Sequence, residues 1–487
     1  MLPISDHSSP EKPKTPTKSL DRKNSNSFSF SYIQTLIYHP RSCLILLILI
    51  LQILIIYASL SLPISSFSLH RSLPAEITTV SLNSTELCPN GKVYIYDIPE
   101  SFNKEFLYKC KELSPWGSRC GTFSNNGLGK KFTAVANVVP KSVVNAWYRT
   151  DQFALEIIFH DRMVNYKCRT NEPGLATAFY IPFYAGLAVG KYLWSSNYTA
   201  KDRDYHCEMI LKWVQEQPYW NRSNGWDHFI SMGRITWDFR RTKDGDWGSK
   251  CIYLPGMRNI TRLLIERNSW DYFDVGVPYP TGFHPSSANE VKIWQDFVNG
   301  RRRRTLYCFA GATRGFIKND FRGLLLRQCY ADSEKCSVVN CGGSKCSNDT
   351  AAILETFLNS DFCLQPRGDS FTRRSIFDCM IAGSIPVFFW KRTAYYQYEW
   401  FLPDEPMSYS VFIDRNEVEN GTSIRSVLEK FSEEEVKKMR AKVVEYIPKL
   451  VYAKPNKGLN DGMKDAFDIA VEGVLKRVKE QEGGYKW

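Results

Sequence analysis

The sequence contains no CxxC pair with a matching His or Cys pair, so it offers no recognisable zinc site. Cysteine itself is not scarce, since fourteen are present and only Cys43 lies in the long apolar segment described below. In an oxidising compartment several of the other thirteen would form disulfides, and their odd number leaves at least one thiol free or paired between chains. The connectivity stays open. One stretch that also contains Gly and Ser is predicted to be a loop stapled by disulfides, and its cysteines are Cys329, Cys336, Cys341 and Cys346.

Acidic residues are too few to balance the basic ones, with 51 Asp and Glu against 63 Lys and Arg, which gives a net charge of +12. Such an excess is typical of proteins that meet nucleic acid, an anionic membrane surface or an anionic substrate. The basic residues are mostly spread along the chain. The one dense run, Arg301–Arg304, is interpreted as a solvated loop before a strand. With 43% hydrophobic and 23% charged residues, most of the chain is expected to fold into two or three globular domains.

Charge is absent altogether from Cys43–Leu62. Twenty residues of helix span about 30 Å, the thickness of the hydrocarbon core of a bilayer, so this segment predicts a transmembrane anchor. A cleaved signal peptide would be shorter and closer to the start of the chain. Only Arg71 follows the segment before Glu76, whereas the side before it carries many basic residues, namely Lys12, Lys14, Lys18, Arg22, Lys23 and Arg41.

This charge asymmetry predicts a type II membrane protein with a cytosolic N-terminus. Residues 1–42 form a disordered cytosolic tail, 43–62 the anchor and 63–87 a Ser-rich stem. Every Asn-X-Ser/Thr glycosylation sequon falls after the anchor, in agreement with a luminal catalytic portion. The sequons are Asn83, Asn197, Asn221, Asn259, Asn348 and Asn420.

Strand and helix patterns alternate after residue 88 and predict a parallel α/β architecture. The first unit, 88–300, has expected strands at 92–99, 177–183 and 228–232 and expected helices at 147–166, 187–193 and 206–216. The second unit, 301–450, has expected strands at 305–310, 361–364, 385–390 and 411–413 and expected helices at 321–329, 370–382 and 423–431. The remaining segment, 451–487, has an expected helix at 464–479 that packs back on the first unit.

The segment from Phe362 to Trp390 is the most informative. A strand ends at Leu364, a polar turn follows, and Ser370 is expected to cap the helix that comes next. Free N–H groups at the helix start, together with nearby guanidinium groups, would bind a diphosphate, and Asp378 would accept hydrogen bonds from a ribose. A second basic turn follows the strand at 305–310. The full predicted donor set is Gly311, Arg314, Arg367, Gly368, Asp369, Ser370, Arg373, Arg374 and Asp378.

An alternative interpretation stays open for this segment. At helical spacing, Arg373 and Arg374 could merely pair with Asp369 and Asp378. The second basic turn, with Arg314, favours the anion site, because ligands bind at the carboxyl ends of parallel strands.

At this point the sequence resembles the exostosin-type glycosyltransferases of family forty-seven, and within them the plant branch that decorates xyloglucan. The resemblance is carried by several long motifs in one order, and these are VYIYDIPESFN (93–103), WYRTDQFALEIIFHDRM (147–163), AFYIPFYAGL (178–187), GWDHFISMGRITWDFRR (225–241), FAGATRG (309–315) and the segment 367–387.

The resemblance implies a GT-B fold, in which two Rossmann-like domains face each other across a cleft. The second domain would bind a UDP-sugar and the first an acceptor, and transfer would invert the anomeric centre. It also implies that no bound metal is required, in agreement with the absence of a DxD motif at the donor turn. The DRD motif at Asp202 is interpreted as a solvated loop.

Inverting transfer needs a general base from the acceptor domain. Asp227 and His228 are the first candidates, because a carboxylate can orient an imidazole and tune its pKa. Glu156 and His160 are held in reserve. The alternative for Asp227 and His228 is a structural pair at the start of a strand. Exposed aromatic rings would stack on the acceptor sugars, and the candidates, each of which could equally belong to the core, are Trp147, Trp226 and Trp237.

The expected function is transfer of galactose from UDP-galactose to xylosyl side chains of xyloglucan in the Golgi lumen, with the Golgi membrane and other wall glycosyltransferases as partners. Related enzymes of the same fold would transfer arabinose or galacturonic acid, or act on galactoglucomannan. An inactive Golgi scaffold is a further alternative. The luminal topology argues against the nucleic-acid partner that the net charge would allow.

Overall fold

The computed structural model describes residues 50–54, 88–315, 320–343, 346, 350–455 and 458–482. The chain divides into two compact units, Met1–Val80 and Ser81–Trp487. In the first unit, the described residues 50–54 are helical, and the rest of the predicted anchor at 43–62 lies outside the described residues. Within the part of the chain that the structure describes, no helix has the length and apolar character needed to cross a membrane. The predicted tail and stem also lie outside this part.

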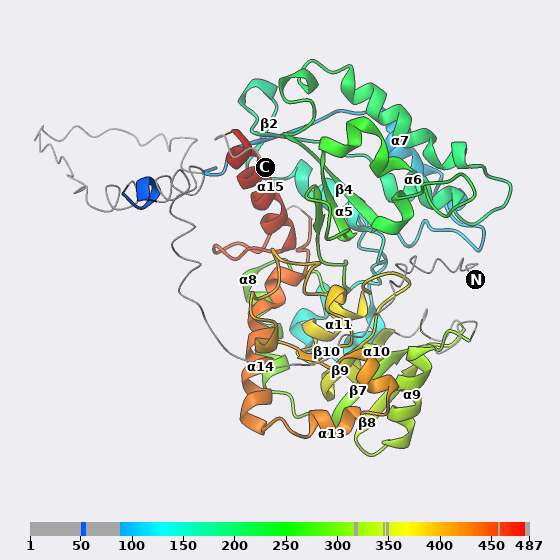
Figure 1. The fold of residues 1–487 in the computed structure, drawn as a ribbon, viewed down its shortest axis with the longest axis vertical. Coiled ribbons are helices and arrows are strands. Elements are labelled where there is room, and N and C mark those ends of the chain that lie inside the picture. Colours follow the sequence, from blue (N-terminus) through cyan, green and yellow to red (C-terminus); the bar gives the residue numbers. More distant parts are fainter. Residues whose placement is uncertain are drawn as a thin grey trace, which may run out of the picture. The chain divides into compact units, whose positions relative to one another are not determined.

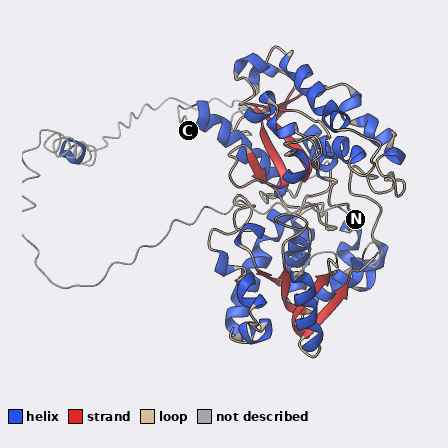
Figure 2. Ribbon diagram, turned by 45° about the vertical axis from the view of Figure 1, so that its right-hand side comes forward, coloured by secondary structure: helices blue, strands red, loops and turns tan. Residues whose placement is uncertain are grey.

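The unit Ser81–Trp487 contains two parallel sheets, each accompanied by helices (Figure 1; Figure 2). The first sheet has the order β2-β1-β3-β4-β5-β6, and all its strand pairs are parallel. Its strands are β1 (Val93–Ile95), β2 (Arg169–Thr170), β3 (Ala178–Tyr180), β4 (His228–Ile235), β5 (Thr261–Glu266) and β6 (Asp274–Gly276). The helices in this half of the sequence are α4 (Lys104–Tyr108), α5 (Leu155–Val164), α6 (Ala185–Tyr192), α7 (Ala200–Gln215) and α8 (Ala288–Asn299).

The second sheet has the order β11-β10-β9-β7-β8 and is also parallel throughout. Its strands are β7 (Thr305–Gly311), β8 (Cys336–Asn340), β9 (Ser360–Gln365), β10 (Ile385–Phe388) and β11 (Val411–Phe412). The helices that follow β7 in sequence are α9 (Phe321–Ala331), α10 (Thr350–Leu358), α11 (Ser375–Ile381), α12 (Arg415–Glu419), α13 (Ile424–Leu428), α14 (Glu433–Tyr446) and α15 (Ala466–Glu482).

The two-sheet α/β architecture confirms the predicted fold class at this level. Strands β3 and β5 are buried along their whole length, as expected for parallel strands covered on both faces. The final helix, α15 (red in Figure 1), contacts β3. Its Phe467 packs on Phe159 of α5. The prediction that the C-terminal helix packs back on the first unit is therefore confirmed.

Several expected elements differ from the observed ones. The helix expected at 147–166 begins only at Leu155, because Trp147 and Tyr148 form bridges to Phe283 and Lys131. Asp202, interpreted as part of a solvated loop, belongs to α7, where its carboxylate accepts the N–H of Thr199 at 2.7 Å in a capping box. Strands β5, β6 and β8 and helices α8, α10 and α14 were not anticipated.

The predicted domain boundary near residue 300 does not follow the packing. Residues 132–147 and helix α8 share a hydrophobic cluster with Cys308 and Cys363 of the second sheet. Conversely, Phe377 of α11 packs with the core of the first sheet. Core contacts therefore cross the boundary in both directions, and the linear division stays a prediction.

Disulfides staple the described chain at six places. The pairs are Cys88–Cys168, Cys110–Cys120, Cys207–Cys251, Cys329–Cys336, Cys341–Cys346 and Cys363–Cys379. Within these residues Cys308 is the free, buried cysteine, so the expected leftover thiol is confirmed. The predicted stapled loop holds two of the pairs, but strand β8 runs through it.

Candidate functional site

Two loops meet at the carboxyl ends of the neighbouring strands β7 and β9. The loop after β7 begins at Gly311, and its Arg314 forms an ion pair with Asp369 of the loop after β9. Arg373 donates from Nη2 to the carbonyl of Ala310 at 2.8 Å. Arg322, in the first turn of α9, donates to the carbonyl of Arg367 at 3.1 Å. The structure thus brings the two predicted basic turns together and adds Arg322, which the sequence did not reveal.

Four arginines therefore converge here, namely Arg314, Arg322, Arg367 and Arg373. Burial, reinforced by Arg322 and Arg314, lowers the pKa of Arg373 to about 9. Burial, with Arg314 next, lowers the pKa of Arg322 to about 10 and also lowers that of Arg367. Lowered arginine pKa values mean that positive charge is crowded and poorly solvated at this place. An anion with several oxygens would relieve that strain and accept charge-assisted hydrogen bonds.

The two carboxylates at the cluster, Asp320 and Asp369, do not balance its four arginines. Asp369 is exposed, and Asp320 is used by the backbone, accepting from the N–H groups of Arg314, Arg322 and Gly323. Nη1 of Arg373 is buried without a hydrogen-bond partner. A buried guanidinium donor without a partner is costly, and it marks where an incoming oxygen would bind.

The helix expected to help bind the anion is shorter than predicted. It begins at Ser375 after Arg374, so Ser370 is not its N-cap, and with seven residues it offers little macrodipole. Gly368 has a different role from the expected ligand approach. A Cβ there would lie 1.9 Å from the carbonyl oxygen of Thr372, so the loop closes on itself at this glycine. The guanidinium groups, rather than a helix N-terminus, supply the positive charge of this candidate site.

Arg374 and Asp378 follow the alternative interpretation. Arg374 Nε lies 3.1 Å from Asp378 Oδ2, one helical turn away, and Nη1 donates to the carbonyl of Thr150 at 2.5 Å. Burial raises the pKa of Asp378, which Arg374 partly offsets. This pair holds the loop after β9 against the segment around Thr150. Both side chains therefore have partners within the protein and do not require a nucleotide.

Asp227 and His228 lie at the amino end of β4. In a parallel sheet all carboxyl ends lie at one edge, and seven residue steps of about 3.3 Å place His228 roughly 23 Å from that edge. The imidazole is fully buried, with Nδ1 2.6 Å from Asp227 and Nε2 2.8 Å from the hydroxyl of Tyr96. Burial lowers the pKa of His228, although Asp227 opposes that shift. Full burial at the amino edge, with both ring nitrogens engaged, favours the structural alternative for this pair over the predicted catalytic role.

The reserve candidates are also engaged in the fold. Glu156 accepts the N–H groups of Gly186 at 2.5 Å and Gly233 at 2.8 Å, and burial raises its pKa to about 7. It joins the start of α6 to β4. His160 lies 2.9 Å from the hydroxyl of Tyr184, and burial lowers its pKa to about 4.

Glu266 is the acid that the sequence did not reveal. It ends β5, so it lies at the carboxyl edge of the first sheet, and its Oε2 accepts the N–H of Thr372 at 2.9 Å. Burial raises its pKa to about 7, although hydrogen bonds from Ser370 and Thr372 act to lower it. Oε1 is buried and has no hydrogen-bond partner. The only sequence signal would have been an acid at the end of an apolar run, and that strand was not anticipated.

The three candidate tryptophans lie in different settings. Trp147 is 3% exposed and packs on Trp294 and Phe283, so it belongs to the core. Trp226 is 42% exposed but precedes β4, at the amino edge. Trp237 is 60% exposed and follows the carboxyl end of β4, so it remains a candidate for acceptor contact.

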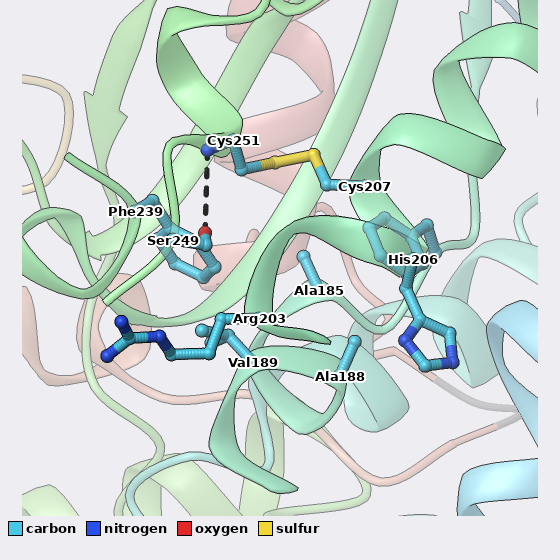
Figure 3. A pocket seen from close by; sticks show the side chains of 10 residues that line it. Ala185, Ala188, Val189, Arg203, His206, Cys207, Phe239, Ser249 and Cys251 are labelled. Carbon is cyan, nitrogen blue, oxygen red and sulfur yellow. Dashed lines mark hydrogen bonds between the residues drawn. A yellow bond between two sulfur atoms is a disulfide. The ribbon is translucent and has the colours of Figure 1, made fainter. Parts of the chain in front are cut away.

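Two cavities among the described residues lie away from the arginine cluster. A cavity of about 340 Å³ is lined by Ile252, Tyr253, Arg258 and Asp271, none of which belongs to the predicted donor set. A second, of about 10 Å³, lies beside α6, α7 and the Cys207–Cys251 disulfide, with Arg203 and His206 on its wall (Figure 3). That volume is close to that of a single water probe, so it reflects internal packing.

Comparison with known proteins places the chain in a family. The Exostosin GT47 domain model matches residues 87–430. The chain belongs to this family, and it is a glycosyltransferase. This confirms the resemblance noted from the motifs.

Three relatives from Arabidopsis thaliana illustrate the similarity. Xyloglucan galactosyltransferase XLT2 is 60% identical over 523 aligned residues that cover the whole of both chains. Xyloglucan galactosyltransferase MUR3 is 41% identical over 81% of this chain and 64% of its own length. Xyloglucan-specific galacturonosyltransferase 1 is 38% identical over 80% of this chain and 58% of its own length. Among solved structures, the crystal structure of the GtfA/B complex aligns over 57% of this chain and 60% of its own with 9% identity, and its TM-score of 0.27 is too low to bear on the fold.

Proposed function

We propose that the protein transfers galactose from UDP-galactose to xylosyl side chains of xyloglucan, with inversion at the anomeric carbon. The observation that carries this proposal is the 60% identity, over the full length of both chains, to a protein named as a xyloglucan galactosyltransferase. The arginine cluster supports it independently, because it supplies the positive charge that a diphosphate leaving group requires.

As in a GT-B fold, the second sheet carries the donor site and the first sheet carries the acceptor site. The loops after β7 and β9 bind the UDP-sugar, and Arg314, Arg322, Arg367 and Arg373 neutralise the charge that develops on UDP as the glycosidic bond breaks. Because these groups can supply the neutralising charge, we propose that no bound metal is required. A direct check is transfer in the presence of a chelator, which should be unchanged.

The general base is then an acid at the carboxyl edge of the first sheet, and Glu266 is our candidate. Its pKa of about 7 suits proton transfer near neutral pH, and its Oε1 has no geometric hydrogen-bond partner. The side chain is fully buried beneath the loop that contains Ser370 and Thr372, so that loop must move for an acceptor hydroxyl to reach it. The Glu266→Gln variant should lose transfer about 100-fold or more and keep its affinity for UDP. Undiminished transfer would exclude this role.

The proposed activity is tested with the full-length, detergent-solubilised chain. It is incubated with UDP-galactose, UDP-arabinose and UDP-galacturonic acid, each with xyloglucan oligosaccharides, and the product mass is read. A hexose increment from UDP-galactose is expected. No transfer from any donor would favour the inactive scaffold instead.

One alternative donor has specific support. A relative named xyloglucan-specific galacturonosyltransferase 1 shares 38% identity, and a crowded arginine cluster would also accommodate a carboxylate. An increment with the mass of a uronic acid, and none from UDP-galactose, would assign this activity. A pentose increment would point to an arabinose-transferring member of the same fold, and a parallel incubation with galactoglucomannan would reveal the remaining alternative acceptor.

We further propose a type II location in the Golgi membrane, where complexes with other wall glycosyltransferases could form. The uncharged segment 43–62 and the basic residues before it support this. Asn197, Asn221 and Asn420 are exposed and Asn259 is partly exposed, so all four sequons are accessible, whereas Asn83 and Asn348 lie outside the described residues. Protease treatment of sealed microsomes should spare a C-terminal epitope, and its loss without detergent would overturn the topology.

A further inference from the structure

Trp270 presents its indole to solvent from the connection between β5 and β6. It is 76% exposed, more than any other large hydrophobic side chain of the described residues. A single exposed aromatic is normal on a protein surface, so exposure alone does not indicate a function. The surroundings of Trp270 supply the other observations.

The segment that leads to this indole, Arg267–Trp270, is held by hydrogen bonds. Arg267 donates from Nε to the carbonyl of Tyr396 at 2.8 Å, and Ser269 donates to the same carbonyl at 3.0 Å. The N–H of Arg267 donates to Gln397 Oε1 at 2.9 Å, and the N–H of Trp270 donates to Asn268 Oδ1 at 3.2 Å. An exposed ring on a fixed backbone is preorganised, which lowers the entropy cost of binding a ligand.

A chain of cation–ring contacts links Trp270 to the arginine cluster. The guanidinium of Arg392 lies 5.2 Å from the Trp270 ring and 5.8 Å from the Trp390 ring. The guanidinium of Arg367, a member of the cluster, lies 5.9 Å from the same Trp390 ring. Trp270 is therefore connected to the proposed donor site through Arg392 and Trp390, and it comes from the half of the chain that contains the first sheet.

Trp237 is a second exposed indole of the first-sheet half of the chain, directly after β4. Trp270 lies in the connection that returns the chain from the end of β5 to the start of β6, and it is the indole that these cation–ring contacts link to the arginine cluster. A glucan chain presents successive flat, apolar ring faces, whereas a single sugar presents one.

We propose that Trp270 is a specificity-determining residue that stacks on the sugar backbone of the polysaccharide acceptor and holds it beside the donor site. This inference rests on the proposed function for the identity of the acceptor. The indole supplies a large, rigid contact area at low entropic cost. It makes no contact with the reacting atoms, so its effect falls on acceptor binding and leaves the chemical step intact.

The test compares the full-length wild type with Trp270→Ala, Trp270→Tyr and the control Trp116→Ala. Trp116 is 69% exposed and packs on Trp194, and no observation places it at the site. Two measurements are made on each protein: binding of a xyloglucan oligosaccharide by calorimetry, without any donor, and KM and kcat for transfer. The affinity for UDP serves as a check that the donor site is intact.

Trp270→Ala should weaken oligosaccharide binding and raise the acceptor KM by about 5- to 30-fold, with kcat and UDP affinity within about 2-fold. Trp270→Tyr should recover most of the loss, and Trp116→Ala should behave as the wild type. Unchanged oligosaccharide binding in Trp270→Ala overturns the inference, as does an equal loss of UDP affinity. Wild-type protein that binds the oligosaccharide through Trp270 but transfers no sugar would overturn the proposed function alone.

Discussion

Glu266, the last residue of β5, accepts a hydrogen bond at 2.9 Å from the backbone N–H of Thr372, in the loop that follows β9. One buried carboxylate thus joins the edge of the first sheet to the loop that carries Arg367 and Arg373. Its pKa is raised by burial, so the contact depends on pH.

The pH dependence of stability should reveal this group. Its pKa rises from 4.5 to about 7 on folding, so the folded state holds the proton more tightly than the unfolded state. The resulting stabilisation is complete below about pH 4.5 and is lost as the pH rises through about 7; at its largest it is about 3 kcal/mol. Burial also raises the pKa of Glu156 to about 7, so Glu156 adds to the same loss of stability with rising pH.

Glu266→Gln removes this titration, so thermal unfolding between pH 4.5 and 8 should show a flatter decline of Tm than in the wild type. Glu417→Gln, the same change at an exposed position of α12, is the matched control. Identical slopes in the wild type and Glu266→Gln would show that Glu266 is not protonated in the native state near neutral pH.

The arginine cluster should determine the affinity for UDP. Each lost guanidinium–phosphate interaction is expected to cost about 1.5–3 kcal/mol, or roughly 10- to 100-fold in Kd. Arg373→Ala and Arg373→Lys should both weaken binding, because an ammonium cannot reproduce the planar fork. Calorimetry with UDP measures the effect.

Arg367→Ala provides a second variant at an exposed position, where folding is not at risk. Arg425→Ala, which removes the same charge from α13, is the control. If Arg367→Ala and Arg373→Ala bind UDP as tightly as Arg425→Ala does, the anion site lies elsewhere.

The sequence predicted those features that local pattern determines. Strands β1, β3, β4, β7, β9 and β10 were found because each is a short apolar run next to a turn signal. The start of α11 was misplaced because residues 370–372 are held by Glu266, which lies more than one hundred residues away in the chain, and no local propensity encodes such a contact. The helix expected from Trp147 onward starts later, at Leu155, because the bridge of Trp147 to the distant Phe283 holds that residue in extended backbone.

The donor side of the candidate site was predicted from the sequence, whereas the acceptor side was not. Both basic turns were found because Gly and Arg follow a strand directly. For His228 the structure favours the structural alternative, because a residue that begins a strand lies at the edge opposite the ligand in a parallel sheet, and adjacency to Asp227 carries no information about that position. Arg322 and Trp270 carry no local motif and became visible only through their contacts.

His228→Ala should therefore reduce stability more than catalysis. It leaves the hydroxyl of Tyr96 and the carboxylate of Asp227 without a buried partner, at a cost of about 1–3 kcal/mol for each group. Asp227 also pairs with Arg222, so Asp227→Asn should destabilise as well. Chemical denaturation measures the loss, and kcat of the remaining folded enzyme should stay within about 3-fold of the wild type. Normal stability with a 100-fold lower kcat would restore the catalytic assignment.

Cys308 should be inert in the native protein. It lies in β7, fully buried beneath the second sheet's helices, and burial raises the pKa of its thiol to about 12, so almost no thiolate is available for alkylation. In a Cys43→Ser background, mass spectrometry after iodoacetamide treatment should find no adduct on the native chain and one adduct after denaturation without reductant. Because the other twelve cysteines are paired, a second adduct would show that one of these disulfides is not formed. An adduct on native Cys308 would show that the sheet opens at β7, next to the loop that carries Arg314.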